Sequence, residues 1–369
     1  MARFSMDVAL AGAVWGGLLL AAGLGAGETT ASHCFVIRVV DADSGRGVPL
    51  VELKTISQTR FWTDSAGIVA FNEPGLMGQD VFFHIKSHGY EEPVPDGFGC
   101  RGIRLKAEAG KTATVKIKRI NIAERLYRIT GEGIYRDSVL AGLPVPLKNP
   151  VLNGKVLGQD TVAMTEYRGR LFWLWGDTNR PDYPLGNFHT SAATSLLPGQ
   201  GGLEPDIGVD LNYFVDETGF SRKMCPLKEP GVVWMGSLVS VPDEKKSERL
   251  LARWSRLTSL TELKERGFAV FNDETETFEK ITTFAAEQHV IPDGQAYRDG
   301  GPTPDRERIY FVTPYPCVRI EARLGAFRQP ERFEAFTCLK PGTRFKGKVS
   351  EVDGESKGRL DWAWKANTS

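Results

Sequence analysis

Residues 159–178 contain two apolar-rich runs that meet at Arg168-Gly169. Two such runs joined by two residues of this kind predict a β-hairpin with a two-residue loop. Pairing outward from that loop places Asp160 opposite Asp177, at the far end of the hairpin. This hairpin limits the arrangement of everything around it, because the register of its strands decides which side chains share a face.

Two carboxylates opposite one another need compensation. Directly opposed side chains lie about 4.5–5.5 Å apart at Cβ, and like charges in such a pair are destabilising. Capping of the turn at Thr178 and Asn179 would explain Asp177 alone. Asp160 and Asp177 together favour a functional site.

The composition bounds the number of domains and the class of partner. The chain has 369 residues, of which 41% are hydrophobic and 25% charged, which suits two globular domains with ample core. Lys plus Arg equals Asp plus Glu at 46 each. This balance argues against a nucleic acid, an anionic membrane or a polyanionic substrate as partner.

The N-terminus has the pattern of a targeting segment. Arg3 precedes an apolar run over residues 8–24, and small residues at 25–27 precede a polar stretch. This pattern predicts a signal peptide over residues 1–27, and hence a secreted or periplasmic protein without a membrane segment after cleavage. An uncleaved anchor is the alternative.

Export makes disulfides possible. We expect Cys34 and Cys100 to be bonded within one domain, which leaves three cysteines and so at least one unpaired among Cys225, Cys317 and Cys338. Their spacing does not match a zinc site, and we expect no metal and no cofactor.

Residues 28–120 contain short alternating strands separated by Gly and Asp turns, which predict a small β-sandwich. Residues 63–71, with the strand and turn before them, resemble carboxypeptidase-regulatory and prealbumin-like modules. The resemblance implies an accessory domain without catalytic residues. Residues 121–150 are rich in Gly and Pro and are expected to be a linker.

From residue 151 the predicted strands come in groups of four, about sixty residues apart, which is the spacing of β-propeller blades. Only three groups can be counted, so we expect residues 151–369 to be an incomplete propeller in a fragment of a longer protein. A blade hidden in the Pro-rich segment and the C-terminal tail is the alternative. One short helix, over residues 259–267, is predicted from a capping box at Ser259 and Glu262 and from Gly267. The fold class is thus all-β, a sandwich followed by a partial five-bladed propeller.

The segments 158–161 and 171–178 resemble the first blade of glycoside hydrolase-type five-bladed propellers. The nearest match is the group of bacterial proteins with a DUF4185 domain, some of which are endo-acting arabinanases. The resemblance implies an inner strand that begins at Asp160, near the central channel where propeller glycosidases keep a catalytic carboxylate, and Asp177 at the same rim.

A glycosidase needs one charged and one protonated carboxyl group, and repulsion across a short gap separates two pKa values in that way. Asp160 and Asp177 are therefore the candidate catalytic pair. The expected register places Trp173 and Trp175 on the same face as the aspartates. Trp175 is expected either to stack on a sugar ring or to pack in the core.

Two further residues are candidates for substrate binding. His189 begins the third strand of the first group and is expected either to line the channel or to be a hydrogen-bonded structural histidine. Asp293 stands where the inner strand of the third group should begin, and a Pro-Asp-Gly turn explains it without function.

The predicted function is an exported glycoside hydrolase-like protein that acts on a polysaccharide, with arabinan-type polymers as one expected substrate. The alternatives are a non-catalytic carbohydrate- or surface-binding propeller and an inactive truncated product. The motifs of phosphate-binding loops, serine-hydrolase elbows and zinc metalloproteases are absent from the sequence.

Overall fold

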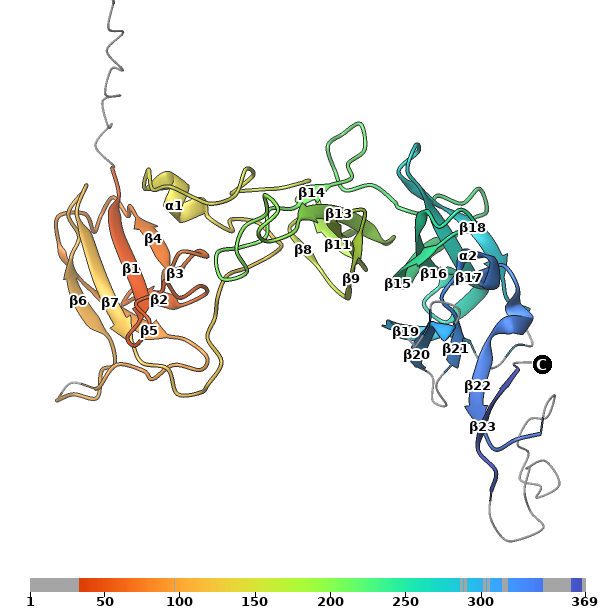
Figure 1. Cartoon of the computed structure of the whole chain (residues 1–369). Helices are drawn as coiled ribbons and strands as arrows, with labels where there is room; N and C mark the ends of the chain where they lie inside the picture. The colour runs from red at the N-terminus through yellow and green to blue at the C-terminus, as the bar shows by residue number, and fades with distance from the viewer. Residues whose placement is uncertain are drawn as a thin grey trace, which may run out of the picture.

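The computed structural model describes residues 33–95, 97–285, 288, 291–300, 303, 306–313, 318–340 and 360–366 (Figure 1). These residues form an all-β structure, as predicted, with two short helices, α1 (Arg136–Leu140) and α2 (Leu324–Phe327), and one 3₁₀ turn, η2 (Pro330–Arg332). The predicted signal peptide and Cys317 lie outside the described residues. Among those described, no helix combines the length and apolarity needed to cross a bilayer.

The N-terminal region is a sandwich of two sheets. One sheet has the order β4-β1-β7 and the other β3-β2-β5-β6. Alternate side chains of both sheets enter one shared core, in which Ile37, Leu53 and Phe83 are fully buried. The seven strands are β1 (Phe35–Asp41), β2 (Glu52–Thr55), β3 (Arg60–Trp62), β4 (Ile68–Phe71), β5 (Asp80–Lys86), β6 (Ile103–Lys106) and β7 (Thr112–Ile117).

The segment expected to be a linker is docked on this sandwich. Asp137 in α1 accepts a hydrogen bond from Ala70 N through Oδ1, at 3.0 Å. Buried Asp64 of the sandwich accepts one from Ser138 N through Oδ2, at 2.7 Å. These two carboxylates bind α1 against β4, so at least this part of residues 121–150 is structured.

Three further antiparallel sheets follow along the chain; the first two match the predicted groups of four, and the third has a fifth strand. The first has the order β14-β13-β10-β9, the second β15-β16-β17-β18 and the third β19-β20-β21-β22-β23. A small sheet β12-β11-β8 extends the first. The strands are β8 (Gly158–Gln159), β9 (Val162–Tyr167), β10 (Arg170–Trp175), β11 (Thr178–Arg180), β12 (Tyr183–Asn187), β13 (Ser191–Leu196), β14 (Asn212–Tyr213), β15 (Val232–Pro242), β16 (Glu248–Ser259), β17 (Glu262–Asn272), β18 (Thr277–Thr283), β19 (Asp293–Asp299), β20 (Arg308–Thr313), β21 (Val318–Glu321), β22 (Glu334–Thr337) and β23 (Ala363–Ala366).

The β15–β18 sheet is buried on both faces. Along β17, Phe268 and Val270 enter the core shared with β20 and β21, whereas Ala269 and Phe271 enter the core shared with β9 and β10. The two cores follow the two-residue period of a strand, so the β15–β18 sheet packs between its neighbours in the sequence.

The predicted helix over residues 259–267 is wrong. Residues Ser259 and Glu262 form the end of the β16–β17 hairpin instead. Leu260 and Leu263, within the predicted helix, are exposed. The local capping pattern is overridden because β17 pairs with β16 on one side and with β18 on the other.

The expected disulfide between Cys34 and Cys100 is not formed. Cys34 precedes β1, at the end of the sandwich where its carbonyl accepts a hydrogen bond from Gly110 N. Cys100 precedes the start of β6, and the other end of β6 leads to the turn that contains Gly110. The two cysteines therefore lie at opposite ends of the sandwich. A disulfide needs Cα atoms within about 7 Å of each other.

Candidate functional site

The hairpin that carries the candidate site is formed as predicted. Arg168 and Gly169 both have positive φ, at 49° and 69°, which is the type I′ turn that matches the twist of paired strands. Tyr167 faces Arg170 across this turn, as the two-residue loop requires.

Asp160 and Asp177 are cross-strand neighbours. The register is kept on both sides of them, through Trp175 of β10 and Thr178 of β11. Asp160 N donates to Asp177 O at 3.3 Å, and Asp177 N donates to Asp160 Oδ1 at 3.0 Å. Asp160 is exposed and Asp177 is partly buried. The predicted juxtaposition and its accessibility to solvent are confirmed.

The strands bend at this point. Thr161 has φ 41°, and Gly176 N donates to the carbonyl oxygens of both Asp160 and Thr161, at 2.9 and 3.1 Å. A Cβ atom on residue 176 would lie 2.3 Å from Asp160 Oδ1. Glycine is therefore required there for the Asp160 carboxylate to reach the backbone of its neighbour.

The bend changes which side chains share a face. Gln159 Nε2 donates to Ser191 Oγ at 2.6 Å, and the hydroxyls of Thr178 and Ser191 are 2.8 Å apart. Ser191 is the cross-strand partner of Trp175, so the residues next to the aspartates turn toward the tryptophan face. The aspartates themselves do not share that face, and our expectation on this point is wrong.

Asp177 has the more perturbed carboxyl group of the pair. Burial raises its pKa above the usual value, the neighbouring charge of Asp160 raises it further, and the Trp234 indole N–H lowers it. Asp177 Oδ1 is buried and has no hydrogen-bond partner within the described residues. An unsatisfied buried oxygen favours the protonated form, so the pair combines an accessible Asp160 with an Asp177 that is biased toward the acid.

Trp234 connects the aspartate pair to a small apolar pocket. Its Nε1 donates to Phe188 O at 2.9 Å. Both residues line a pocket of about 210 Å³, together with Leu257 and Leu260. Sequence reasoning missed Trp234, because a tryptophan inside the apolar run of β15 resembles an ordinary core residue.

His189 has a structural role in this arrangement. Its Nδ1 accepts a hydrogen bond from Val233 N at 3.1 Å, which ties the start of β13 to β15. Burial, with a smaller effect of Lys223, lowers its pKa to about 4, so the imidazole is neutral at pH 7. A neutral ring that accepts through Nδ1 carries its proton on Nε2.

Trp175 and Asp293 are also engaged by the protein. Trp175 is only 5% exposed and packs against Tyr213, so it offers no free ring face to a sugar. The expected substrate contact of Trp175 is corrected accordingly. Asp293 begins β19, as predicted, and its carboxylate forms a bidentate ion pair with Arg253 of β16. That pair joins two sheets, while 40% of the Asp293 side chain stays exposed.

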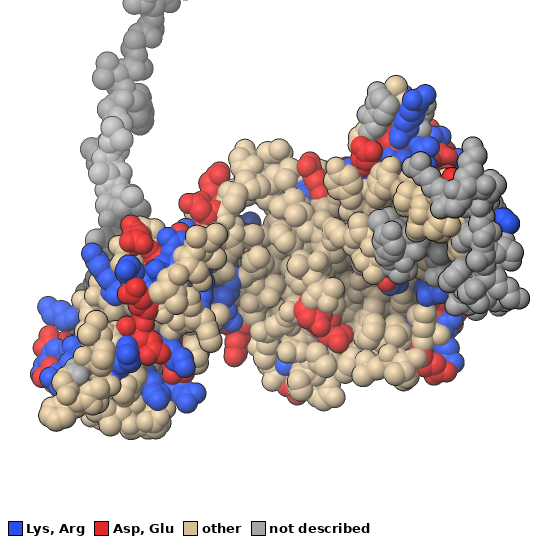
Figure 2. Space-filling model, turned by 90° about the horizontal axis from the view of Figure 1, so that it is seen from below, with Lys and Arg blue, Asp and Glu red and all other residues tan. Residues whose placement is uncertain are grey.

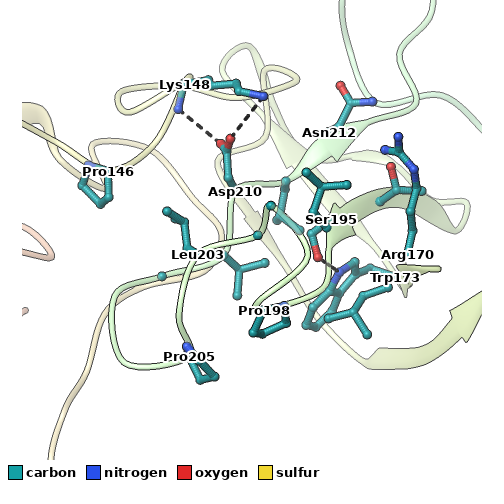
Figure 3. A pocket seen from close by; sticks show the side chains of 18 of the residues that line it. Pro146, Lys148, Arg170, Trp173, Ser195, Pro198, Leu203, Pro205, Asp210 and Asn212 are labelled. Atoms are coloured by element: carbon teal, nitrogen blue, oxygen red, sulfur yellow. Dashed lines mark hydrogen bonds and ion pairs between the residues drawn. The ribbon is translucent and has the colours of Figure 1, made fainter.

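A larger pocket lies elsewhere in the described residues. Its volume is about 670 Å³, and Trp173 is part of its wall (Figure 3). Neither Asp160 nor Asp177 lines it, so pocket size and carboxylate chemistry point to different places. Three or more His, Cys, Asp or Glu side chains do not come together as a metal site anywhere in the described part of the chain.

Comparison of this chain with family models, with curated proteins and with solved structures found no match.

Proposed function

We propose that this protein is an exported glycosidase that hydrolyses polysaccharide at the Asp160–Asp177 pair. The observation that carries the proposal is the raised pKa of Asp177 beside the accessible carboxylate of Asp160. Glycosidases use one protonated and one charged carboxyl group on either side of the bond that is cleaved. The resemblance to DUF4185-type propellers supports the same pair.

The two aspartates have different roles in this proposal. Asp177 donates its proton to the glycosidic oxygen as the bond to the anomeric carbon breaks. Asp160 either attacks that carbon directly or removes a proton from the water that does so, which correspond to retention and inversion. The pocket beside Trp234 would receive a sugar ring next to Asp177. The anomeric configuration of the first product distinguishes the two routes.

The arrangement of the sheets supports a propeller-type scaffold. The first strands of the three sheets lie next to one another, with β15 in contact with both β9 and β19. Sheets that stack face to face with their first strands together have the relation of neighbouring propeller blades. The aspartates lie just before β9 and just after β10, at one end of these strands.

A non-catalytic carbohydrate-binding protein is the second candidate. The observation in its favour is the hydrogen bond from Asp177 N to Asp160 Oδ1, because it gives the Asp160 carboxylate a structural role in the bend. A carboxylate used in this way would be needed for folding whether or not hydrolysis occurs.

Substitution of each aspartate tests the proposal. We expect Asp177→Asn and Asp160→Asn each to lower the release of reducing ends from polysaccharides by about 10²–10⁴-fold, because an amide cannot transfer the proton or act as nucleophile. Asp182→Asn is the matched control, since this exposed aspartate forms an ion pair with nearby Arg180. Arabinans and other plant and bacterial-wall polysaccharides are the substrates to screen.

The pH dependence of stability gives a second readout for Asp177. Its pKa is higher in the folded than in the unfolded protein, so its charge weakens the fold above the unfolded pKa and has no effect below it. Asp177→Asn should raise the melting temperature by about 1–2 °C at pH 7 and leave it unchanged at pH 3. Glycan binding by the wild type without release of reducing ends from any polymer would establish the non-catalytic candidate instead.

A further inference from the structure

The outer face of the β3-β2-β5-β6 sheet of the sandwich is rich in basic residues. Side chains of a strand alternate between two faces, so those that alternate with the core residues of this sheet point away from the core. These outward residues, which we call the basic face, are Glu52, Lys54, Arg60, Trp62, Asp80, Phe82, His84, Lys86, Arg104 and Lys106. Five are Lys or Arg and two are carboxylates, although Lys plus Arg equals Asp plus Glu in the whole chain. The balance of the whole chain therefore conceals a local surplus of positive charge.

This positive charge is only partly compensated by the protein itself. Arg60 contacts Glu52 at 3.7 Å. Lys106 lies opposite Asp80 in the register of β5 and β6, but the two do not form an ion pair. The other three cations of the basic face also have no ion pair with a carboxylate in the part of the chain that the structure describes. Their charge is available to a partner.

One row of the basic face brings basic side chains together. Lys54 in β2 lies directly opposite Arg60 in β3 on one side and His84 in β5 on the other. Like charges in directly opposed positions of a sheet are destabilising. This row is therefore not favoured by folding alone, and an anionic partner would relieve its repulsion.

Two aromatic side chains lie among these cations. Trp62, in the edge strand β3, is 47% exposed. Phe82 lies opposite Arg104, and its ring makes an edge-to-face contact with His84 at a centroid distance of 5.1 Å. A Cβ atom on residue 102 would lie 2.8 Å from this ring, so Gly102 lets Phe82 rest against the backbone. A ring held in this way loses little conformational entropy when a ligand stacks on it.

We propose that the basic face binds an acidic polysaccharide, whose sugar rings contact Trp62 and Phe82 and whose carboxylates pair with the surrounding Lys and Arg side chains. Neighbouring strands lie about 4.7–4.9 Å apart, so the cations extend over about 14 Å from β3 to β6. A polymer with one charge on each of several units matches this spread better than a small anion does. Arginine also suits a carboxylate, because its guanidinium group can bind one through two parallel hydrogen bonds.

The composition of the face favours a polysaccharide over other anionic partners. A lipid bilayer takes up apolar side chains, whereas all residues of the basic face other than Trp62 and Phe82 are polar or charged. The N-terminal sequence predicts export, which makes nucleic acid an unsuitable partner. This role of the sandwich does not depend on hydrolysis at Asp160 and Asp177.

The test measures binding of polygalacturonate and of its fully methyl-esterified form to the full-length protein by calorimetry. We expect the acid to bind about tenfold more tightly than the ester at low salt, and the preference to shrink as salt is added. Lys54→Gln together with Arg104→Gln should lower affinity for the acid about tenfold, because two ion pairs are lost. Trp62→Ala should lower affinity for both polymers.

The matched control removes two positive charges from the other sheet of the sandwich. Arg38→Gln with Lys116→Gln alters exposed positions of β1 and β7, and this double variant should bind polygalacturonate like the wild type. Asp177→Asn should also bind it like the wild type, which separates the basic face from the proposed catalytic pair.

Several results would overturn the proposal. Equal affinity for acid and ester, or unchanged affinity after the two substitutions in the basic face, would remove the role of its cations. An equal loss in the control variant would show that overall charge, and not this face, attracts the polymer. Failure of both polygalacturonate and dextran sulfate to bind would exclude acidic polysaccharides. Tighter binding of phosphatidylglycerol vesicles or of single-stranded DNA would assign the face to a membrane or a nucleic acid.

Discussion

The N-terminal sandwich and the three-sheet region achieve burial in different ways. In the sandwich each sheet contributes one face to a single core. In the three-sheet region the β15–β18 sheet contributes both faces, to two separate cores. Figure 2 shows a parallel difference at the surface, because charged residues are interspersed over the sandwich, while the middle of the molecule is largely uncharged on this side.

The difference shows where each region depends on its neighbours. The core of the sandwich is formed by its own strands and turns, whereas the outer sheets of the second region each bury one face against the β15–β18 sheet. Their other faces keep exposed apolar side chains, such as Val162 and Met164 of β9 and Val312 of β20. Exposed apolar residues grouped in this way mark surfaces that are suited to contact with further protein or ligand.

Truncation of one core residue in each region tests whether the two unfold separately. Phe268→Ala should destabilise the three-sheet region by about 3–5 kcal/mol, because Phe268 is fully buried among Phe311, Phe327 and Phe333. Phe71→Ala should do the same to the sandwich alone. Calorimetry should resolve two unfolding transitions, and each variant should lower the midpoint temperature of one of them. A single transition that both variants shift equally would contradict this division.

The connection between the regions is tested at Asp64. This buried carboxylate accepts hydrogen bonds from Ser138 N at 2.7 Å and from Ile68 N at 3.1 Å. Asp64→Ala leaves these donors unsatisfied, and we expect a loss of about 2–3 kcal/mol from the sandwich together with release of α1. Faster proteolysis of residues 121–150 is the measurement, and exposed Asp43→Ala is the control. Unchanged cleavage would show that α1 is held by other contacts.

The smallest expected effect is a pH dependence confined to the three-sheet region. The pKa of His189 is about 4 when folded and near 6.5 when unfolded, so between these values the unfolded state binds the additional proton. Stability is full above pH 6.5 and should fall by about 1 kcal/mol as the pH drops to 4, after allowance for partial exposure. His189→Asn keeps an acceptor for Val233 N and should remove this dependence. His88 is an exposed residue of the sandwich, and the control variant His88→Asn should retain the pH dependence.

The parts of the site that follow from local sequence were predicted, and those that need distant contacts were not. The hairpin register follows from a two-residue turn and alternating side chains, so Asp160 was correctly placed opposite Asp177. The face on which the two aspartates lie was misjudged, because the bend at Thr161 has no clear signal in the sequence. Trp234 comes from a different sheet, and its approach to Asp177 depends on packing that a linear pattern does not contain.

The strand order of the two regions also affects how quickly each can fold. In the sandwich, β1 pairs in parallel with β7. The sheet is therefore complete only when residues as distant in sequence as Val36 and Thr112 have paired. In the three-sheet region most strands pair with the next strand in the chain, and the β9–β10 pair is closed by the two-residue turn at Arg168. Because closure of a long loop slows folding, we expect the β9–β10 hairpin to form early in refolding and the sandwich, although it comes first in the chain, to close late.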